Sequence, residues 1–190
     1  IGVPGVMPML DMAHKEPGKL AWAPLFNEGI RLASSGYKIP GRMGDAIRTN
    51  AANLQLDANA VAAYFNADGT PKTTGTVTTN LPYAQSLRTL ATGGADAMYS
   101  GPLAEAIVAK AAQSVGDDVA KTPITPSLMT VTDLKNYQAK KREPVCTTYR
   151  SSYYICTMSP PSSGGIAIAQ SLGILENFDL SQYGPTNPSN

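Results

Sequence analysis

The chain has 190 residues, of which 43% are hydrophobic and 15% charged, and fifteen basic against fourteen acidic side chains give a net charge of +1. This balance excludes the dense basic stripe that binding to a phosphate backbone requires. The hydrophobic content excludes a disordered tail, and no apolar run reaches the ~20 residues of a membrane-spanning helix. One His and two Cys are too few for a structural zinc site built from these residues.

The charged fraction is well below the ~25% of an ordinary soluble domain. We therefore expect part of the surface to be buried against another part of a larger protein. The two ends favour the same expectation. Residues 1–6 lack the basic flank and apolar stretch of a signal peptide, and residues 183–190 are expected to be a polar loop, so both ends are interpreted as cut from a longer chain.

The pattern up to residue 139 is mainly helical, with apolar residues at helical spacing and Pro, Gly and Asp at the element ends. Helices are predicted at 22–34, 45–54, 57–65, 82–90, 95–99 and 102–115. Asn66-Ala67-Asp68-Gly69 is typical of a turn. Gly116 is expected to end the last of these helices, residues 116–130 to form a loop, and Thr132 to cap a short helix that reaches Tyr137.

Residues 145–149 and 153–157 are rich in β-branched and aromatic side chains, and a three-residue connection joins them. They predict an antiparallel hairpin. If Tyr149 faces Tyr153, then Cys146 lies opposite Cys156, close to the separation that a disulfide needs. Two alternatives stay open, namely two buried thiols and a reactive cysteine. A disulfide would indicate an oxidising compartment.

The most distinctive segment follows the hairpin and precedes a predicted helix at 163–176. It consists of Pro160, Pro161, Ser162, Ser163, Gly164 and Gly165. The prolines should end the strand, the serines can cap the helix, and the glycines allow its first turn to press against neighbouring backbone. Free amides at a glycine-rich helix start can also bind an anion, so structural packing and a ligand-facing loop both remain possible.

A complete active site is not recognisable in these residues. His14, the single histidine, lies in a polar turn and is expected on the solvated surface. Asp117-Asp118 is expected to be an ordinary loop pair, and residues 66–70 lack the ligands of a calcium loop. A phosphate-binding Gly-x-x-x-x-Gly-Lys-Ser/Thr motif is absent. Neither a metal site nor a cofactor is indicated.

Seven segments, in order along the chain, resemble the large subunit of γ-glutamyltranspeptidase. The six-residue segment 160–165 is the most specific of them. The others are Gly2-Val3-Pro4-Gly5-Val6, residues 14–20, Leu32-Ala33-Ser34-Ser35-Gly36-Tyr37, Ser86–Ala91 with Gly94–Gly101, Thr132–Tyr137 before Arg142-Glu143-Pro144-Val145, and residues 174–180. Residues 116–130 are longer than the short turn of the family.

The resemblance implies an α+β, helix-rich fragment of an N-terminal-nucleophile (Ntn) hydrolase of αββα architecture, with one late β-hairpin. Residues 1–190 would be a single fragment, mainly helical at 1–139, with the hairpin at 145–157, the helix at 163–176 and no independent second domain. The family uses an N-terminal Thr of its small subunit as nucleophile and an Arg early in its large subunit to hold the substrate carboxylate.

Those two residues are expected after Asn190 and before Ile1, so no catalytic or substrate-binding residue is assigned to this chain. The resemblance implies a small subunit of the same precursor as partner, γ-glutamyl substrates, a periplasmic or secreted location, and no cofactor, nucleic acid or membrane span. The fragment alone should be inactive. Two alternatives are a related acylase that removes β-lactam side chains and a secreted, helical binding module without catalysis.

Overall fold

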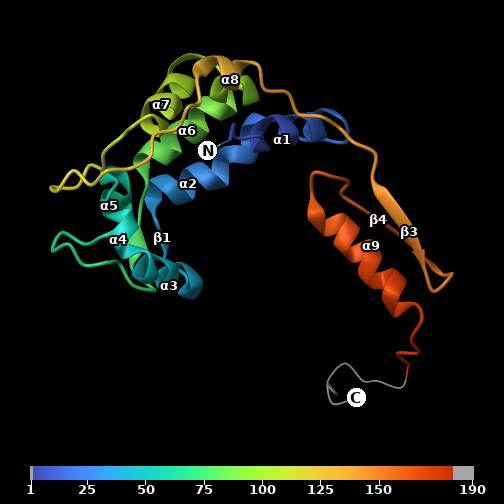
Figure 1. Cartoon of the computed structure of the whole chain (residues 1–190). Coiled ribbons are helices and arrows are strands. Elements are labelled where there is room, and N and C mark those ends of the chain that lie inside the picture. Colours follow the sequence, from blue (N-terminus) through green and yellow to red (C-terminus); the bar gives the residue numbers. More distant parts are fainter. Residues whose placement is uncertain (1, 182–190) are drawn as a thin grey trace. The chain divides into compact units, whose positions relative to one another are not determined.

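A computed structural model describes residues 2–181, so the polar loop expected at 183–190 lies outside the described residues. The chain divides into two compact units between Ala139 and Lys140. The first is helical, and the second contains a hairpin and one helix (Figure 1). The α+β, helix-rich class expected from the sequence is confirmed. No helix among residues 2–181 is long and apolar enough to cross a bilayer.

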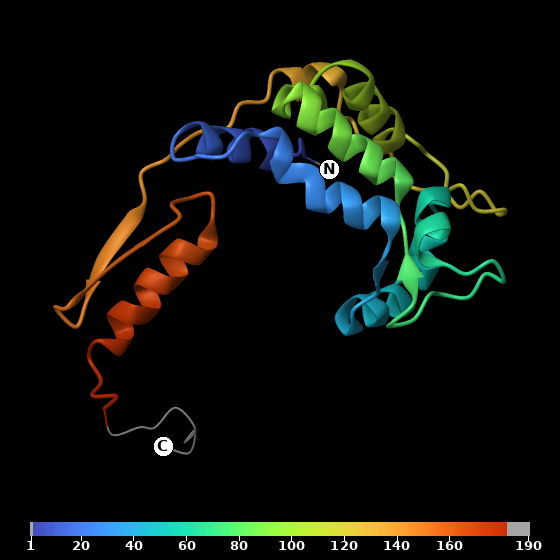
Figure 2. The same ribbon diagram turned by 180° about the vertical axis from the view of Figure 1, so that it is seen from behind.

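The first unit is built on α2 and α6, which lie side by side in both views (Figures 1 and 2). Gly29 of α2 permits this close approach, because a Cβ at this position would lie 3.2 Å from Leu87 Cδ1. The helices of the unit are α1 (Val6–Lys15), η1 (Ala23–Phe26, a 3-10 helix), α2 (Asn27–Ser35), α3 (Gly41–Thr49), α4 (Ala51–Leu54), α5 (Ala58–Tyr64), α6 (Leu81–Gly93), η2 (Ala95–Met98, also 3-10), α7 (Gly101–Ala111) and α8 (Val131–Lys135).

Most of the predicted helices and the turn at 66–69 are present. The expected helix at 45–54 is interrupted at Asn50, where α3 ends and α4 begins. Asp57 caps α5 by accepting the Ala60 amide at 2.9 Å. Helix α1 and a two-stranded pairing of β1 (Tyr37–Lys38) with β2 (Val77–Thr78) were not predicted, and the pairing joins segments far apart in sequence.

The predicted extent of the helix at 102–115 is wrong, because α7 ends at Ala111. The loop that follows folds back, and its backbone groups form hydrogen bonds with the residues at and after the end of α7. The Ser127 amide donates to the Ala111 carbonyl at 2.8 Å, and Val115 forms a β-bridge with Pro123. These tertiary hydrogen bonds replace the next helical turn, so Gly116 does not cap the helix.

One buried cluster of the first unit lies around α7 and α8, and other buried residues, such as Ile39 and Ala84, lie elsewhere in the unit. Tyr99, Ala104, Met129 and Leu134 form this cluster. The Tyr99 ring stacks on Tyr137 with ring centroids 6.1 Å apart, and its hydroxyl donates to the Pro4 carbonyl. The start of the chain is thereby fixed to the core.

The start of α8 corrects the predicted cap. Thr130, rather than Thr132, precedes the helix and accepts the Asp133 amide at 3.2 Å. Asp133 in turn accepts the Thr130 amide at 2.8 Å, which completes a capping box. Both threonines satisfy the local sequence preference, and the path of the loop decides between them.

The second unit consists of β3 (Val145–Tyr149), β4 (Tyr153–Thr157) and α9 (Ser163–Leu175). The strands pair antiparallel with Tyr149 opposite Tyr153 and Cys146 opposite Cys156, so the predicted register is confirmed. Helix α9 packs against both strands. Gly165 is the one buried residue among 140–181, so these described residues form no hydrophobic core of their own.

Candidate functional site

The segment that the sequence singles out connects β4 to α9. The Pro160–Pro161 peptide bond is cis, and the chain then turns into the helix at Ser163. The predicted serine cap is wrong, because the side chain of Ser162 at the N-cap position makes no capping hydrogen bond. Its backbone amide instead donates to the Ser159 carbonyl at 3.3 Å.

The two glycines of this segment have different surroundings. A Cβ at Gly165 would lie 2.0 Å from the Met158 carbonyl oxygen and 3.0 Å from Thr157 Cγ2. A Cβ at Gly164 would meet nothing closer than Ser162 Oγ, at 3.8 Å. Gly165 therefore lets the first turn of α9 press against the end of β4, as the packing hypothesis for this segment predicts.

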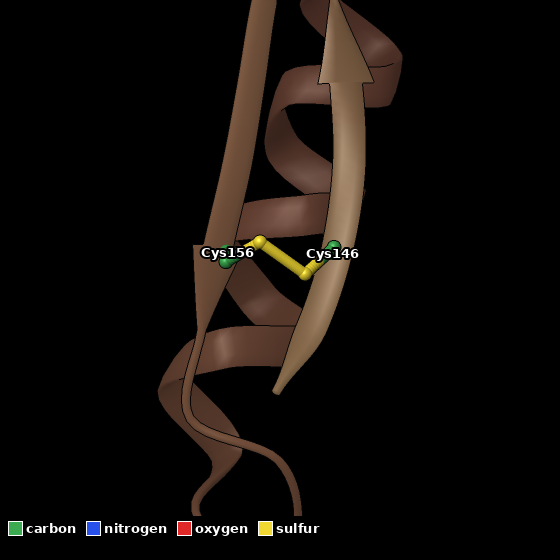
Figure 3. Close-up of a disulfide and its surroundings, with 2 residues drawn as sticks. All are labelled: Cys146 and Cys156. Atoms are coloured by element: carbon green, nitrogen blue, oxygen red, sulfur yellow. A yellow bond between two sulfur atoms is a disulfide. The ribbon is translucent and has the colours of Figure 1, made fainter. Parts of the chain in front are cut away.

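The hairpin is cross-linked between its strands. Cys146 and Cys156 form a disulfide, with their Cα atoms 4.1 Å apart (Figure 3). Side chains alternate between the two faces of a strand. Thr157 faces α9 through its contact with Gly165, so neighbouring Cys156 faces the other way, and Cys156 is exposed.

Arg150 holds the other end of α9. It lies in the hairpin turn, where Arg150 and Ser151 adopt positive φ angles of 54° and 52°. Its guanidinium donates to the Leu175 carbonyl at 3.0 Å and to the Phe178 carbonyl, while its amide donates to Glu176 Oε1 at 3.0 Å. A cation is favourable at a helix C-terminus. With the contact at Gly165, the hairpin therefore touches α9 at both ends of the helix.

Sequence reasoning missed the role of Arg150. The turn carries neither Gly nor Asn, the residues that usually signal positive φ. The bonded carbonyls lie more than 20 residues further along the chain. The one available signal was a basic residue at the tip of a hairpin that precedes a helix.

A second set of polar contacts joins α5, α7 and the loop after α7. Lys110 Nζ lies 2.7 Å from an Asp57 carboxylate oxygen and 2.8 Å from one of Asp117. The hydrogen bond from Lys110 holds the pKa of Asp57 and of Asp117 below its usual value. The bonds to Asp117 and Asp57 raise the pKa of Lys110. All three groups are charged at neutral pH and serve to connect elements.

The other candidate groups also have structural partners. His14 Nε2 lies 2.8 Å from the Leu20 carbonyl oxygen, and its ring forms a T-shaped contact with Trp22. Asp118 accepts the Thr122 hydroxyl at 2.9 Å. Across residues 2–181, no three His, Cys, Asp or Glu side chains cluster closely enough to hold a metal ion.

The first unit contains a pocket of about 380 Å³ between α2, α5 and the start of α6. Tyr37, Tyr64 and Tyr83 line it together with Leu32 and Thr78. Burial raises the pKa of Tyr37, so this phenol stays protonated at neutral pH. The hydroxyl of Thr78 already donates to the Ala63 carbonyl. The lining provides apolar contact and no activated nucleophile.

The comparisons with known proteins identify the family of this chain. The sequence model of the family described as gamma-glutamyltranspeptidase matches residues 1–190. The chain belongs to the gamma-glutamyltranspeptidase family. The resemblance of its short motifs to that family is confirmed.

Relatives and solved structures agree with this membership. The glutathione hydrolase proenzyme of Escherichia coli (strain K12) is 31% identical over 183 residues, which cover 96% of this chain and 30% of the proenzyme. The Acylase ACY 1 proenzyme of Pseudomonas sp. (strain V22) is 33% identical and is covered to 31%. The crystal structure of Helicobacter pylori gamma-glutamyltranspeptidase superposes with a TM-score of 0.84 at 29% identity, over 98% of this chain and 50% of that one.

Proposed function

We propose that the protein to which this chain belongs is a γ-glutamyl hydrolase and transferase that acts on glutathione and related amides. The observation that carries the proposal is the family match over residues 1–190, together with relatives named glutathione hydrolase. The chain spans about 30% of these relatives. Its own part would be to form the scaffold of a large subunit, as a single fragment without an independent second domain.

The chemistry would follow the N-terminal-nucleophile mechanism. The hydroxyl of an N-terminal Thr beyond Asn190 would attack the γ-glutamyl amide, and the α-amine of that Thr would accept its proton. Backbone amides would stabilise the tetrahedral intermediate, and an Arg before Ile1 would bind the substrate carboxylate. The γ-glutamyl ester would then pass to water or to an amine acceptor, without a cofactor.

A second subunit from the same precursor is the proposed partner. The relatives' names include the word proenzyme, which supports processing. Helix α9 carries no charged residue and is mostly apolar, and Ile166, Ile168 and Ile174 are exposed. A helix with so much exposed apolar surface is usually buried in a larger protein, so α9 fits a position inside a two-subunit assembly.

The disulfide supports a periplasmic or secreted location. Structural disulfides persist in oxidising compartments and are rare in the cytosol, and Cys146 is bonded to Cys156. Mass spectrometry of the protein from its native source, with thiols blocked before lysis, would test this. A fully reduced pair would contradict the proposed location.

Turnover of γ-glutamyl-p-nitroanilide by the complete gene product tests the function. We expect release of p-nitroaniline that depends on the N-terminal Thr of the small subunit, and none from the 190-residue chain alone. Activity of the purified 190-residue chain above a mock preparation would refute the scaffold role. A correctly processed complete protein without γ-glutamyl turnover would refute the substrate.

The second candidate is an acylase, which the similarity to Acylase ACY 1 proenzymes favours. Their identity to this chain, 33%, slightly exceeds the 31% and 32% of the two glutathione hydrolase proenzymes. Competition between γ-glutamyl-p-nitroanilide and an acyl-cephalosporin on the complete protein separates the two. A higher kcat/KM for the cephalosporin would replace the first proposal. The relatives are named as enzymes, so no comparison favours the non-catalytic binding module.

A further inference from the structure

The second unit depends on few contacts within residues 140–181. Its hairpin has only two strands, and a two-stranded hairpin depends on packing against another element, here α9, or on a cross-link for its stability. Gly165 is the one buried residue among those described in this unit. Close packing at Gly165 and hydrogen bonds from Arg150 fix the hairpin at the two ends of α9, and only half-buried side chains lie between them. With so little buried surface among these residues, the cross-link between the strands adds to what orders the hairpin.

Among residues 2–181, the disulfide is also placed where a small thiol can reach it. Cys156 is exposed and Cys146 is half-buried. Their neighbours on the same face, Thr148 and Tyr154, are exposed, with Tyr154 at 75%. The face that α9 covers carries the half-buried residues Val145, Thr147, Tyr149, Ile155 and Thr157.

We propose that the Cys146–Cys156 disulfide is a redox latch, which low-molecular-weight thiols open in the native protein and whose opening loosens the hairpin from α9. A thiolate attacks Cys156 Sγ, the sulfur–sulfur bond breaks, and Cys146 leaves as a thiolate that takes up a proton. A second thiol then attacks the sulfur of the bound small molecule and releases the Cys156 thiol. Two thiols are oxidised to one small-molecule disulfide, and the protein gains two thiols.

The consequence would be confined to the second unit. The cysteines are 10 positions apart, and closing a ring of about 11 residues restricts the open chain enough to change the opening equilibrium roughly 100-fold. The hydrogen-bonded and buried contacts of residues 2–139 involve neither cysteine. Reduction should therefore leave the first unit unchanged.

Hydrogen exchange on the complete protein, with and without dithiothreitol, tests the latch. Alkylation and mass spectrometry measure how many thiols are released before any denaturant is added. We expect both cysteines to be alkylated, peptides from 145–175 to exchange up to about 100-fold faster, and peptides from 2–139 to keep their rates. The Cys146→Ser/Cys156→Ser double variant should show the same pattern without dithiothreitol.

The matched control changes the adjacent pair on the same exposed face. Thr148→Ser/Tyr154→Phe keeps the disulfide and should exchange like the parent protein in the oxidised state. Two results would overturn the proposal. One is a disulfide that dithiothreitol leaves intact in the native protein. The other is full reduction with no faster exchange at 145–175, which would show that other contacts hold the hairpin.

Discussion

Substitution of the two neighbouring glycines at the start of α9 should have opposite effects. In Gly165→Ala, the new methyl group would lie 2.0 Å from the Met158 carbonyl oxygen. An ordinary contact between carbon and oxygen is about 3.3–3.6 Å, so the helix must move by more than 1 Å or the end of β4 must shift. Because the clash is with backbone, no rotamer change relieves it.

The magnitude follows from overpacking, which typically costs 1–3 kcal/mol. We expect Gly165→Ala to lower the free energy of unfolding by about 2–3 kcal/mol, at the upper part of this range. Gly164→Ala has 3.8 Å to its nearest neighbour. It should be neutral or stabilise by up to about 1 kcal/mol, because Ala is a better helix former than Gly.

Urea unfolding of both variants in the complete protein measures the difference. Hydrogen exchange of peptides from 157–175 assigns it to the second unit. Equal stability of the two variants, or a loss below about 0.5 kcal/mol for Gly165→Ala, would refute the tight contact between α9 and β4. Destabilisation by Gly164→Ala alone would reverse the assignment of the two glycines.

Two further predictions concern the first unit. Thr130→Ala should cost about 1 kcal/mol, because it removes a capping side chain, while Thr132→Ala should change stability by less than about 0.5 kcal/mol in the same urea titration. The pKa values of Asp57 and Asp117 are lowered in the folded state, so their contribution to stability should be lost as the pH falls below their ordinary value of 3.8. The raised pKa of Lys110 means that its contribution should be lost above pH 10.5. Lys110→Met should flatten both limbs of a plot of melting temperature against pH.

Each of these predictions has a result that contradicts it. A larger loss from Thr132→Ala than from Thr130→Ala would restore Thr132 as the cap of α8. If Lys110→Met leaves the dependence of melting temperature on pH unchanged at both the acid and the alkaline end, the ion pairs with Asp57 and Asp117 contribute nothing measurable to stability. Exposed ion pairs commonly contribute little, and the side chain of Lys110 is 40% exposed.

The low charge of the chain has a structural counterpart in its exposed apolar side chains. Ile174 and Phe178, in and just after α9, are more than half exposed, and Leu128 in the loop before α8 is 94% exposed. Isolated apolar residues at the surface are normal, but an apolar helix with a single buried residue is unusual. We expect the 190-residue chain alone to associate in solution, and analytical ultracentrifugation would detect this.

Local sequence signals determined much of this protein. Alternating β-branched and aromatic residues, with three residues between them, fixed the hairpin and its register and placed Cys146 opposite Cys156. Asp57 capped its helix as predicted. These features depend on residues close together in sequence, whose geometry a strand or helix period dictates. The ordered set of short motifs also identified the family.

Tertiary structure decided the features that depend on distant residues. The pairing of β1 with β2, the end of α7 at Ala111 and the contact of Lys110 with two aspartates each join segments separated along the chain. Thr130 and Thr132 are equally suitable caps by residue type, and the path of the preceding loop selects Thr130. Gly164 and Gly165 are the same residue type at adjacent positions, and only the position of the Met158 carbonyl distinguishes their surroundings. A backbone atom brought close by folding leaves no mark on the local pattern, which is why sequence reasoning could name the segment but not the residue that matters in it.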